Sequence, residues 1–370
     1  MGTDLRVVIF GYGLAGRYFH APLIRAAEGM VVAGIVTGNE ERAAQAREDN
    51  PGVTIHATAD EAFAQADAYD LAVIAGANSS HVPYARRAID AGWHAIVDKP
   101  FAPNADIARE VLSAASDRGV LMTAFHNRRW DSDFLTLDAL LGSAPIGDVH
   151  RLESRLERRR DVPQDSWKGS NDPAELAGLL LDFGSHLVDQ AIQLLGPVGS
   201  VDCWTRNVRR PDSPVDDMRI TLFHVSGAVS EIIGSQASVF TEPRFTVLGL
   251  GGGIRTLGFD IQEPQLRANP DATSPGFGVE PEESAAVVVT VSPEGRIQES
   301  RLPLVRGAWT TFYPAVREAI LSGAPLPVTP QDVVETLRVL DAAAESAALG
   351  LRVSLDPPAG HARHVTRPSN

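Results

Sequence analysis

The segment VVIFGYGLAGRYFHAPL, at residues 7–23, constrains the fold more than any other part of the chain. An apolar run leads into glycines at positions 11, 13 and 16, and apolar side chains at helical spacing follow. This order predicts a strand, a tight turn and a helix, in which the glycines permit the turn, a close backbone approach to a pyrophosphate, and tight helix packing. Backbone N–H groups at the helix start would face the anion. We therefore predict a dinucleotide-binding loop that comprises Gly11, Tyr12, Gly13, Leu14, Ala15 and Gly16.

Composition narrows the class of protein. At 370 residues with 44% hydrophobic content, the chain is long enough for two domains. A net charge of -14 argues against nucleic acid or an acidic membrane as partner, because both bind basic surfaces. The single cysteine, Cys203, excludes an internal disulfide and suits a reducing compartment. With no signal-like start and no apolar stretch of transmembrane length, we expect a cytoplasmic protein.

Short apolar runs alternate with helical patterns through the first third of the chain. Expected strands cover residues 31–36, 71–75, 94–97 and 120–123, and expected helices cover residues 40–48, 61–66, 79–91 and 105–118. This alternation implies right-handed crossovers and a parallel, doubly wound sheet. The predicted fold class is α/β, with a Rossmann domain over residues 1–124.

The pattern changes after residue 124, where longer alternating segments such as HRLESRLERRR, ITLFHV and AAVVVTV follow. They predict a second, α+β domain over residues 125–356 with a large, mostly antiparallel, open sheet, and residues 357–370 as a tail. We expect this sheet to pair with a copy of itself in a homodimer or homotetramer. The arginines of residues 155–160 are expected on the solvent face of a strand, without function. Residues 263–281 predict a long surface loop.

The end of the second strand indicates which cofactor is preferred. Enzymes that prefer NAD usually carry an acidic residue there, which binds the ribose 2'-hydroxyl. Here Thr37, Gly38 and Asn39 occupy that position, and Arg42 follows shortly after. These groups favour NADP over NAD, although two glutamates also lie close by in the sequence.

Several motifs in order carry a family resemblance. These are GYGLAG, ANSSH at residues 77–81, IVDKPF at 96–101, LLDFGSHLVDQ at 180–190 and the closing SGAPLPVTPQDV. Together they resemble the Gfo/Idh/MocA oxidoreductases over nearly the whole chain. The segments FHNRRWDSDFLTL, HLVDQAI and GFDIQEPQL resemble the branch that contains NADP-dependent scyllo-inositol dehydrogenase.

The resemblance implies a role for Lys99. In the family, the lysine of an E-K-P motif reaches the nicotinamide side and a substrate hydroxyl, where its ammonium stabilises developing charge. Asp98 replaces the family glutamate and keeps a shorter carboxylate. Without the motif, a surface lysine in a salt bridge would be the ordinary interpretation.

His186 follows Asp182 by four residues, so a helix that starts near Asp182 would place both on one face. An imidazole titrates near neutral pH and suits a general base, and His186 matches the family's base. Asp182 would hold a substrate hydroxyl and help orient the imidazole. The alternative is a core histidine, and a metal site would lack ligands. Asp189 is interpreted as a structural hydrogen-bond partner.

The remaining candidates are less specific. Asn78 and His81 belong to the ANSSH segment, in which helix capping is an alternative role. Asn127 is expected where the domains meet, near the nicotinamide or substrate, and Trp167 near the cofactor or at a rim. The segment ELAGLLLDFG, which leads up to His186, has fewer glycines than the corresponding segment commonly has in the family.

These features predict a dehydrogenase that transfers a hydride between NADP or NAD and a secondary hydroxyl of a cyclic polyol or sugar, with inositol-like substrates favoured. Multiple hydrogen-bonding side chains suit polyol recognition, because a mismatched hydroxyl leaves buried polar groups unpaired. Two alternatives stay open. One is a non-redox glycosidase of the same fold that uses NAD transiently, and the other is a non-catalytic, cofactor-sensing regulator.

Overall fold

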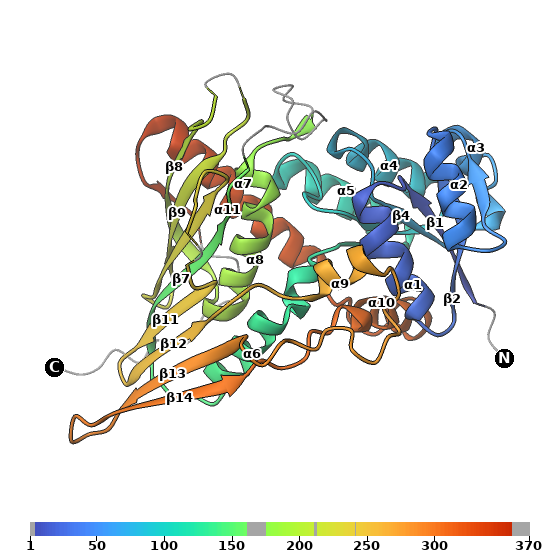
Figure 1. Cartoon of the computed structure of the whole chain (residues 1–370). Coiled ribbons are helices and arrows are strands. Elements are labelled where there is room, and N and C mark those ends of the chain that lie inside the picture. Colours follow the sequence, from blue (N-terminus) through green and yellow to red (C-terminus); the bar gives the residue numbers. More distant parts are fainter. Residues whose placement is uncertain (1–3, 161–174, 211–212, 241, 357–370) are drawn as a thin grey trace.

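The computed structural model describes residues 4–160, 175–210, 213–240 and 242–356. Trp167 and the predicted tail therefore lie outside the described residues. Figure 1 shows two sheets side by side, with helices between them and around the first sheet. Among the described helices, none combines the length and apolar character needed to span a membrane.

The first sheet is parallel throughout and has the strand order β3-β2-β1-β4-β5-β6. Its strands are β1 (Leu5–Phe10), β2 (Met30–Val36), β3 (Thr54–His56), β4 (Leu71–Ile74), β5 (His94–Val97) and β6 (Met122–Ala124). Its helical segments are η1 (Ala15–His20), α1 (Ala21–Ala26), α2 (Glu40–Asp49), α3 (Ala59–Phe63), η2 (Ala66–Ala68), η3 (Asn78–Ser80), α4 (His81–Ala91) and α5 (Ala105–Arg118). This arrangement confirms the predicted Rossmann topology. Because strand order reverses between β1 and β4, the carboxyl ends of these two strands border the crevice where ligands bind in such sheets.

Local differences from the predicted boundaries have identifiable causes. The helix expected at residues 61–66 begins earlier, at Ala59, because the Thr58 hydroxyl caps it by accepting from the Glu61 N–H at 3.3 Å. The strand β3 is short and was not predicted. Its three residues are too few for an alternating pattern to show.

The second sheet is mixed and has the order β14-β13-β12-β11-β7-β10-β9-β8-β15. Its strands are β7 (Val149–Glu157), β8 (Val198–Arg206), β9 (Asp217–His224), β10 (Val229–Ser235), β11 (Phe245–Gly249), β12 (Gly252–Thr256), β13 (Ala285–Val291), β14 (Ile297–Pro303) and β15 (Val353–Ser354). Only the β7–β10 pair is parallel within this sheet as described, so the prediction of a mostly antiparallel sheet is confirmed.

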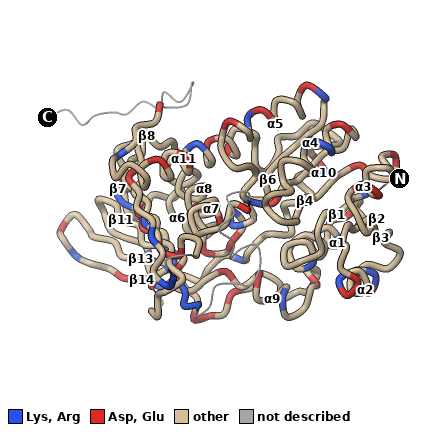
Figure 2. Tube along the Cα trace, turned by 90° about the horizontal axis from the view of Figure 1, so that it is seen from above, with Lys and Arg blue, Asp and Glu red and all other residues tan. Residues whose placement is uncertain are grey.

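Helices cover the face of this sheet that is turned toward the first sheet (Figure 1). Those packed against the sheet are α6 (Ser132–Gly142), α7 (Leu179–Asp182), α8 (Gly184–Leu195) and α11 (Pro330–Leu349). The other helical segments of this part of the chain are η4 (Asn127–Trp130), α9 (Gln262–Ala268), η7 (Trp309–Thr311) and α10 (Phe312–Ser322), of which α9 and η7 contact η1 and α1 of the first domain. Alternate residues of β9 are buried beneath this layer, as in a strand with one covered face. Figure 2 shows acidic and basic residues interspersed along the described chain.

The prediction of a surface loop at residues 263–281 is partly wrong. The helix α9 occupies the first part of it, and only the later residues lack a regular element. Pro264 suggested a loop, but it lies in the first helical turn, where a missing N–H leaves no intrahelical bond unmade.

Candidate active site

A cavity of about 680 Å³ extends from the carboxyl ends of β1 and β4 to the helices α7 and α8. From the first domain it is lined by Gly11, Gly13, Leu14, Ala15, Arg42, Asn78, Asp98 and Lys99. From the second domain it is lined by Asn127, Arg128, Asp182, His186 and several further arginines. The structure thus brings most of the sequence-predicted site residues to one cavity.

The glycine loop has the geometry that its sequence implies. Gly11 turns with φ +99°, and a Cβ there would lie 2.9 Å from the Ala75 carbonyl oxygen. A Cβ on Gly16 would overlap the carbonyl group of Gly11, so only glycine allows the helix to pack this closely. Gly13 lines the cavity and has no heavy atom within 4 Å of its virtual Cβ. This open backbone beside a helix start fits a pyrophosphate.

Two substitutions separate these roles. Gly16→Ala should lower the free energy of unfolding by about 1–3 kcal/mol through overpacking. Gly13→Ala should leave thermal unfolding of the cofactor-free protein unchanged but weaken NADP binding about tenfold, or ~1.4 kcal/mol, because the methyl group enters the ligand space. Unchanged NADP affinity in Gly13→Ala would exclude this loop as the pyrophosphate site.

Not all residues of the loop motif face the cavity. Tyr12 is buried, and its hydroxyl donates to Asp49 Oδ2 at 3.0 Å and accepts from Asn50 Nδ2 at 2.8 Å. Its side chain therefore ties the loop to the end of α2 and does not line the cavity.

At the end of β2, one side chain of the predicted ribose-binding group reaches the cavity. Arg42 lines it, whereas Thr37, Gly38 and Asn39 do not. Thr37 is buried, and Asn39 caps α2 by accepting from the Arg42 N–H at 2.8 Å. The capping role explains why an asparagine suits this position in this chain.

Lys99 bridges the two domains at the centre of the cavity. Its Nζ donates to Asp182 Oδ1 at 2.6 Å and to the Asp182 carbonyl oxygen at 2.7 Å. Asp98 lies beside it and accepts from the Lys99 N–H at 2.8 Å. Burial raises the pKa of Asp98, but His20 and Lys99 outweigh burial and hold that pKa below its ordinary value. Asp98 is therefore ionised next to the ammonium group.

His186 lies within the same cavity on α8 and is only 7% exposed. Its Nδ1 is buried without a hydrogen-bond partner among the described residues, which leaves Nε2 as the nitrogen open to the cavity. Burial, followed by the positive charges of Lys99 and Arg128, lowers the pKa of His186 well below 6.5. The imidazole is therefore neutral at pH 7 and able to accept a proton.

The expectation of one helix carrying both Asp182 and His186 is wrong. The helix α7 ends at Asp182 and α8 starts at Gly184. At this break the Ser185 hydroxyl donates to the Leu181 carbonyl at 2.5 Å, and the His186 N–H bonds to Phe183, three residues back. The Ser185 side chain thus competes with backbone N–H groups for a carbonyl oxygen that a regular helix would use. The side chains of Asp182 and His186 nevertheless both line the cavity.

Of the other predicted residues, some line the cavity and others lie outside it. Asn78 lines the cavity, but its amide also donates to the Glu175 carbonyl at 3.2 Å. His81 is buried outside the cavity lining, and its Nδ1 lies 2.8 Å from the Pro100 carbonyl oxygen, so it supports the segment that carries Lys99. Asn127 is buried and lines the cavity.

The structural role predicted for Asp189 is confirmed. Its carboxylate accepts from Arg129 Nη2 at 2.5 Å and from Arg129 Nε at 2.8 Å. Both side chains are largely buried, so this bidentate pair fixes η4 against α8.

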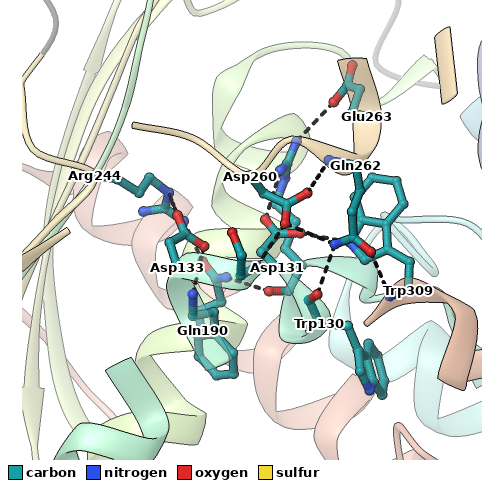
Figure 3. Close-up of polar contacts among 12 residues, drawn as sticks. Trp130, Asp131, Asp133, Gln190, Arg244, Asp260, Gln262, Glu263 and Trp309 are labelled. Atoms are coloured by element: carbon teal, nitrogen blue, oxygen red, sulfur yellow. Dashed lines mark hydrogen bonds and ion pairs between the residues drawn. The ribbon is translucent and has the colours of Figure 1, made fainter. Parts of the chain in front are cut away.

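A buried polar cluster behind Arg128 was not predicted (Figure 3). Arg128 pairs with Asp131 at 3.0 Å and with Glu263 at 3.3 Å, and Asp131 also accepts from Trp309 Nε1 at 2.8 Å. Nearby, burial raises the pKa of Asp133 to about 6, although Arg244 opposes this rise. The sequence shows the polar residues of WDSD at positions 130–133, but their burial depends on distant segments such as residues 260–263. This cluster fixes Arg128 at the cavity wall.

The expectation for the arginines of residues 155–160 is partly wrong, because Arg158 is exposed as expected but lies, with Arg160, on the side of the strand that faces the cavity. Arg155 does lie beside solvent, paired with Glu153 at 3.1 Å and Glu157 at 3.2 Å. Arg158 and Arg160 instead line the cavity. Because side chains alternate along an extended chain, successive arginines point to opposite faces.

Comparison with known families agrees with this geometry. Residues 5–126 match the oxidoreductase family with an NAD-binding Rossmann fold, and residues 134–255 match the Gfo/Idh/MocA C-terminal domain. The fold and site thus define an oxidoreductase with an NAD(P)-binding Rossmann domain. The chain belongs to the Gfo/Idh/MocA family.

Individual relatives extend over almost the entire chain. The oxidoreductase YdgJ of Escherichia coli is 32% identical and covers 94% of this chain and 97% of its own. The NADP-dependent scyllo-inositol 2-dehydrogenase IolW of Bacillus subtilis is 29% identical, with 92% and 93% covered. The solved structure of the Bacillus subtilis oxidoreductase YvaA superposes with a TM-score of 0.90 at 27% identity, covering 96% of this chain and 99% of the other.

Proposed function

We propose that this oxidoreductase oxidises a secondary hydroxyl of a cyclic polyol or sugar with NADP or NAD. The observation that carries the proposal is the meeting of the Lys99–Asp182 pair with a neutral, buried His186 in the cavity that begins at the glycine loop. Similarity to an inositol dehydrogenase supports inositol-like substrates.

The chain's own residues supply binding and proton transfer. NAD(P), held by the Gly11–Gly16 loop, supplies the hydride acceptor. Lys99 orients the reacting hydroxyl and stabilises negative charge on its oxygen. Asp182 positions the ammonium group and accepts a hydrogen bond from a substrate hydroxyl. His186 Nε2 takes the hydroxyl proton, since the ring is neutral and this nitrogen faces the cavity.

A substrate panel tests this proposal. Inositols, other cyclic polyols and aldoses are each incubated with NAD and with NADP, and absorbance of the reduced nicotinamide is followed. We expect at least one cyclic polyol or sugar to be oxidised. Oxidation confined to substrates of another class would contradict the proposed substrate.

We also propose a preference for NADP, supported by Arg42 on the cavity wall and by the absence of a carboxylate at residues 37–39. Arg42→Gln should weaken NADP binding about tenfold, the loss expected for one charge-assisted hydrogen bond, and leave NAD binding unchanged. Arg47→Gln, near the other end of α2 and outside the cavity, is the matched control. Tighter binding of NAD than NADP by the unmodified protein would contradict the preference.

The second sheet supports a proposal about assembly. Helices cover the face that is turned toward the first sheet (Figure 1). The opposite face is available to pair with a second copy, in a homodimer or homotetramer.

A further inference from the structure

The two inward arginines continue the covered face of β7. Leu152, Ser154 and Leu156 alternate as buried residues along the strand. Beyond its end the extended pairing persists, because the N–H groups of Arg158 and Arg160 donate to Ser235 and Gln236 carbonyl oxygens at 2.9 Å each. The side chains of Arg158 and Arg160 therefore follow the same face into the cavity.

These two guanidinium groups lack the partners that neighbouring cations have. Arg128 pairs with carboxylates, Arg209 with Asp216 at 2.8 Å, and Arg267 with Glu263 at 3.3 Å. Within the described part of the chain, the Arg158 and Arg160 side chains make no ion pair or hydrogen bond. Among the described residues, neither guanidinium group therefore has a direct ion-pair partner, although Asp182 and Glu263 lie near enough to Arg158 to raise its pKa.

Arg158 lies close to the reacting groups. Its guanidinium carbon is 5.0 Å from the centre of the Phe183 ring, and Phe183 directly follows Asp182. Arg158 is exposed, and although partial desolvation and the neighbouring Arg160 lower its pKa, the carboxylates of Asp182 and Glu263 oppose that change. An anionic group of a ligand at this position would pair with the guanidinium group, which lines the cavity.

The cofactor's anionic groups have other partners. The pyrophosphate fits the helix start after Gly13, and Arg42 is available for a 2'-phosphate, both on the first domain. The anion facing Arg158 is then carried by the other ligand of the cavity. A guanidinium fork matches the oxygens of a carboxylate or a phosphate.

We propose that the substrate carries a carboxylate or phosphate, and that Arg158, with Arg160, binds this group and selects anionic sugars or polyols. This inference rests on the proposed function and specifies its substrate class. The hydroxyl that reacts would lie at Lys99, Asp182 and His186, and the anionic group beside Phe183.

The test compares neutral and anionic probes in wild type and Arg158→Gln. D-glucose and myo-inositol serve as neutral probes, D-glucuronate as the carboxylate and D-glucose 6-phosphate as the phosphate, all at saturating NADP. We expect wild type to favour one anionic probe in kcat/KM, which also identifies the anion. In Arg158→Gln the KM for that probe should rise about tenfold to a hundredfold, the loss expected for charge-assisted hydrogen bonds, with KM for neutral probes unchanged.

Controls separate charge recognition from damage to the fold. Arg155→Gln removes an arginine from the outer face of the same strand and should change no KM. Arg158→Lys should restore part of the anion preference. Calorimetric titration of the anionic probes into the NADPH complex gives dissociation constants without turnover, and these should weaken in parallel in Arg158→Gln.

Several results would overturn the inference. One is an equal loss for neutral and anionic probes in Arg158→Gln, and another is weaker NADP binding by this variant in the absence of substrate. Oxidation of neutral sugars in preference to both anionic probes, with Arg158→Gln unchanged, would remove this inference and leave the proposed function intact. Absence of oxidation and of binding throughout would remove both.

Discussion

His186→Asn is expected to lower turnover about a hundredfold to ten-thousandfold, the usual contribution of a general base. Asparagine keeps the approximate shape and some hydrogen bonding but has no group that accepts the hydroxyl proton. Affinity for NADP should hardly change, because the glycine loop lies on the other domain. Steady-state turnover and NADP titration measure the two effects separately.

The pH profile provides an independent check on His186. Its pKa is lowered well below 6.5 by burial and by Lys99, Arg128, His126 and Arg244. The base is therefore neutral at pH 7, and the rate should fall only as pH drops below 6.5 and the ring becomes protonated. The Asn variant should lose this acid limb.

His224→Asn is the matched control for a buried histidine. His224 bonds to the Gly196 carbonyl and to Ser230, outside the cavity lining, and burial lowers its pKa to about 4. This variant should lose stability but keep the acid limb of oxidation. If His186→Asn oxidised its substrate at nearly the wild-type rate with the same limb, His186 would be a core histidine.

Lys99→Met is expected to lower turnover about a hundredfold to a thousandfold, comparable to the loss of one electrostatic group at an oxyanion. The methionine keeps the length of the side chain and removes both hydrogen bonds to Asp182. Steady-state kinetics of Lys99→Met and Lys99→Arg measures the effect of charge, since arginine retains the cation.

Asp182→Asn controls for the effect of breaking the ion pair between Lys99 and Asp182. The part-buried Asp182 carboxylate loses Lys99 in Lys99→Met, and asparagine at position 182 removes its negative charge. If the double variant Lys99→Met/Asp182→Asn recovered wild-type turnover, Lys99 would serve only to neutralise Asp182. A loss of turnover in the double variant that exceeds the loss in Asp182→Asn alone, with intact NADP affinity, supports direct action of Lys99 on the substrate oxygen.

The first sheet could be predicted because its signals are local. The glycines at positions 11 and 16 meet steric demands of one turn and one helix contact, both within a short stretch of chain. The alternation of strands and helices follows from short apolar runs and helical periodicity, which are also local signals. The short strand β3 and the helix α9 carried weaker patterns, and α9 contains a proline that usually indicates a loop.

The site was harder to predict because its contacts join distant segments. Lys99 and Asp182 are 83 residues apart, and motif resemblance identified both before any contact was known. Alternation with Leu152 and Leu156 indicates which arginines share their face, but the sequence does not reveal that this face continues into the cavity, which is formed with distant segments. The raised pKa of Asp133 likewise results from burial by remote elements. Trp167 stays a prediction, because it lies outside the described residues.

Hydride transfer itself is the central claim, and isotope transfer tests it most directly. A substrate oxidised in the panel is prepared with deuterium on its carbinol carbon and incubated with unlabelled NADP. We predict that the label appears at C4 of the reduced nicotinamide, with one carbonyl product formed for each NADPH. Substrate cleavage without net reduction of NADP would indicate the glycosidase alternative. NADP binding with no reaction of any probe would indicate a regulator and would contradict the dehydrogenase assignment.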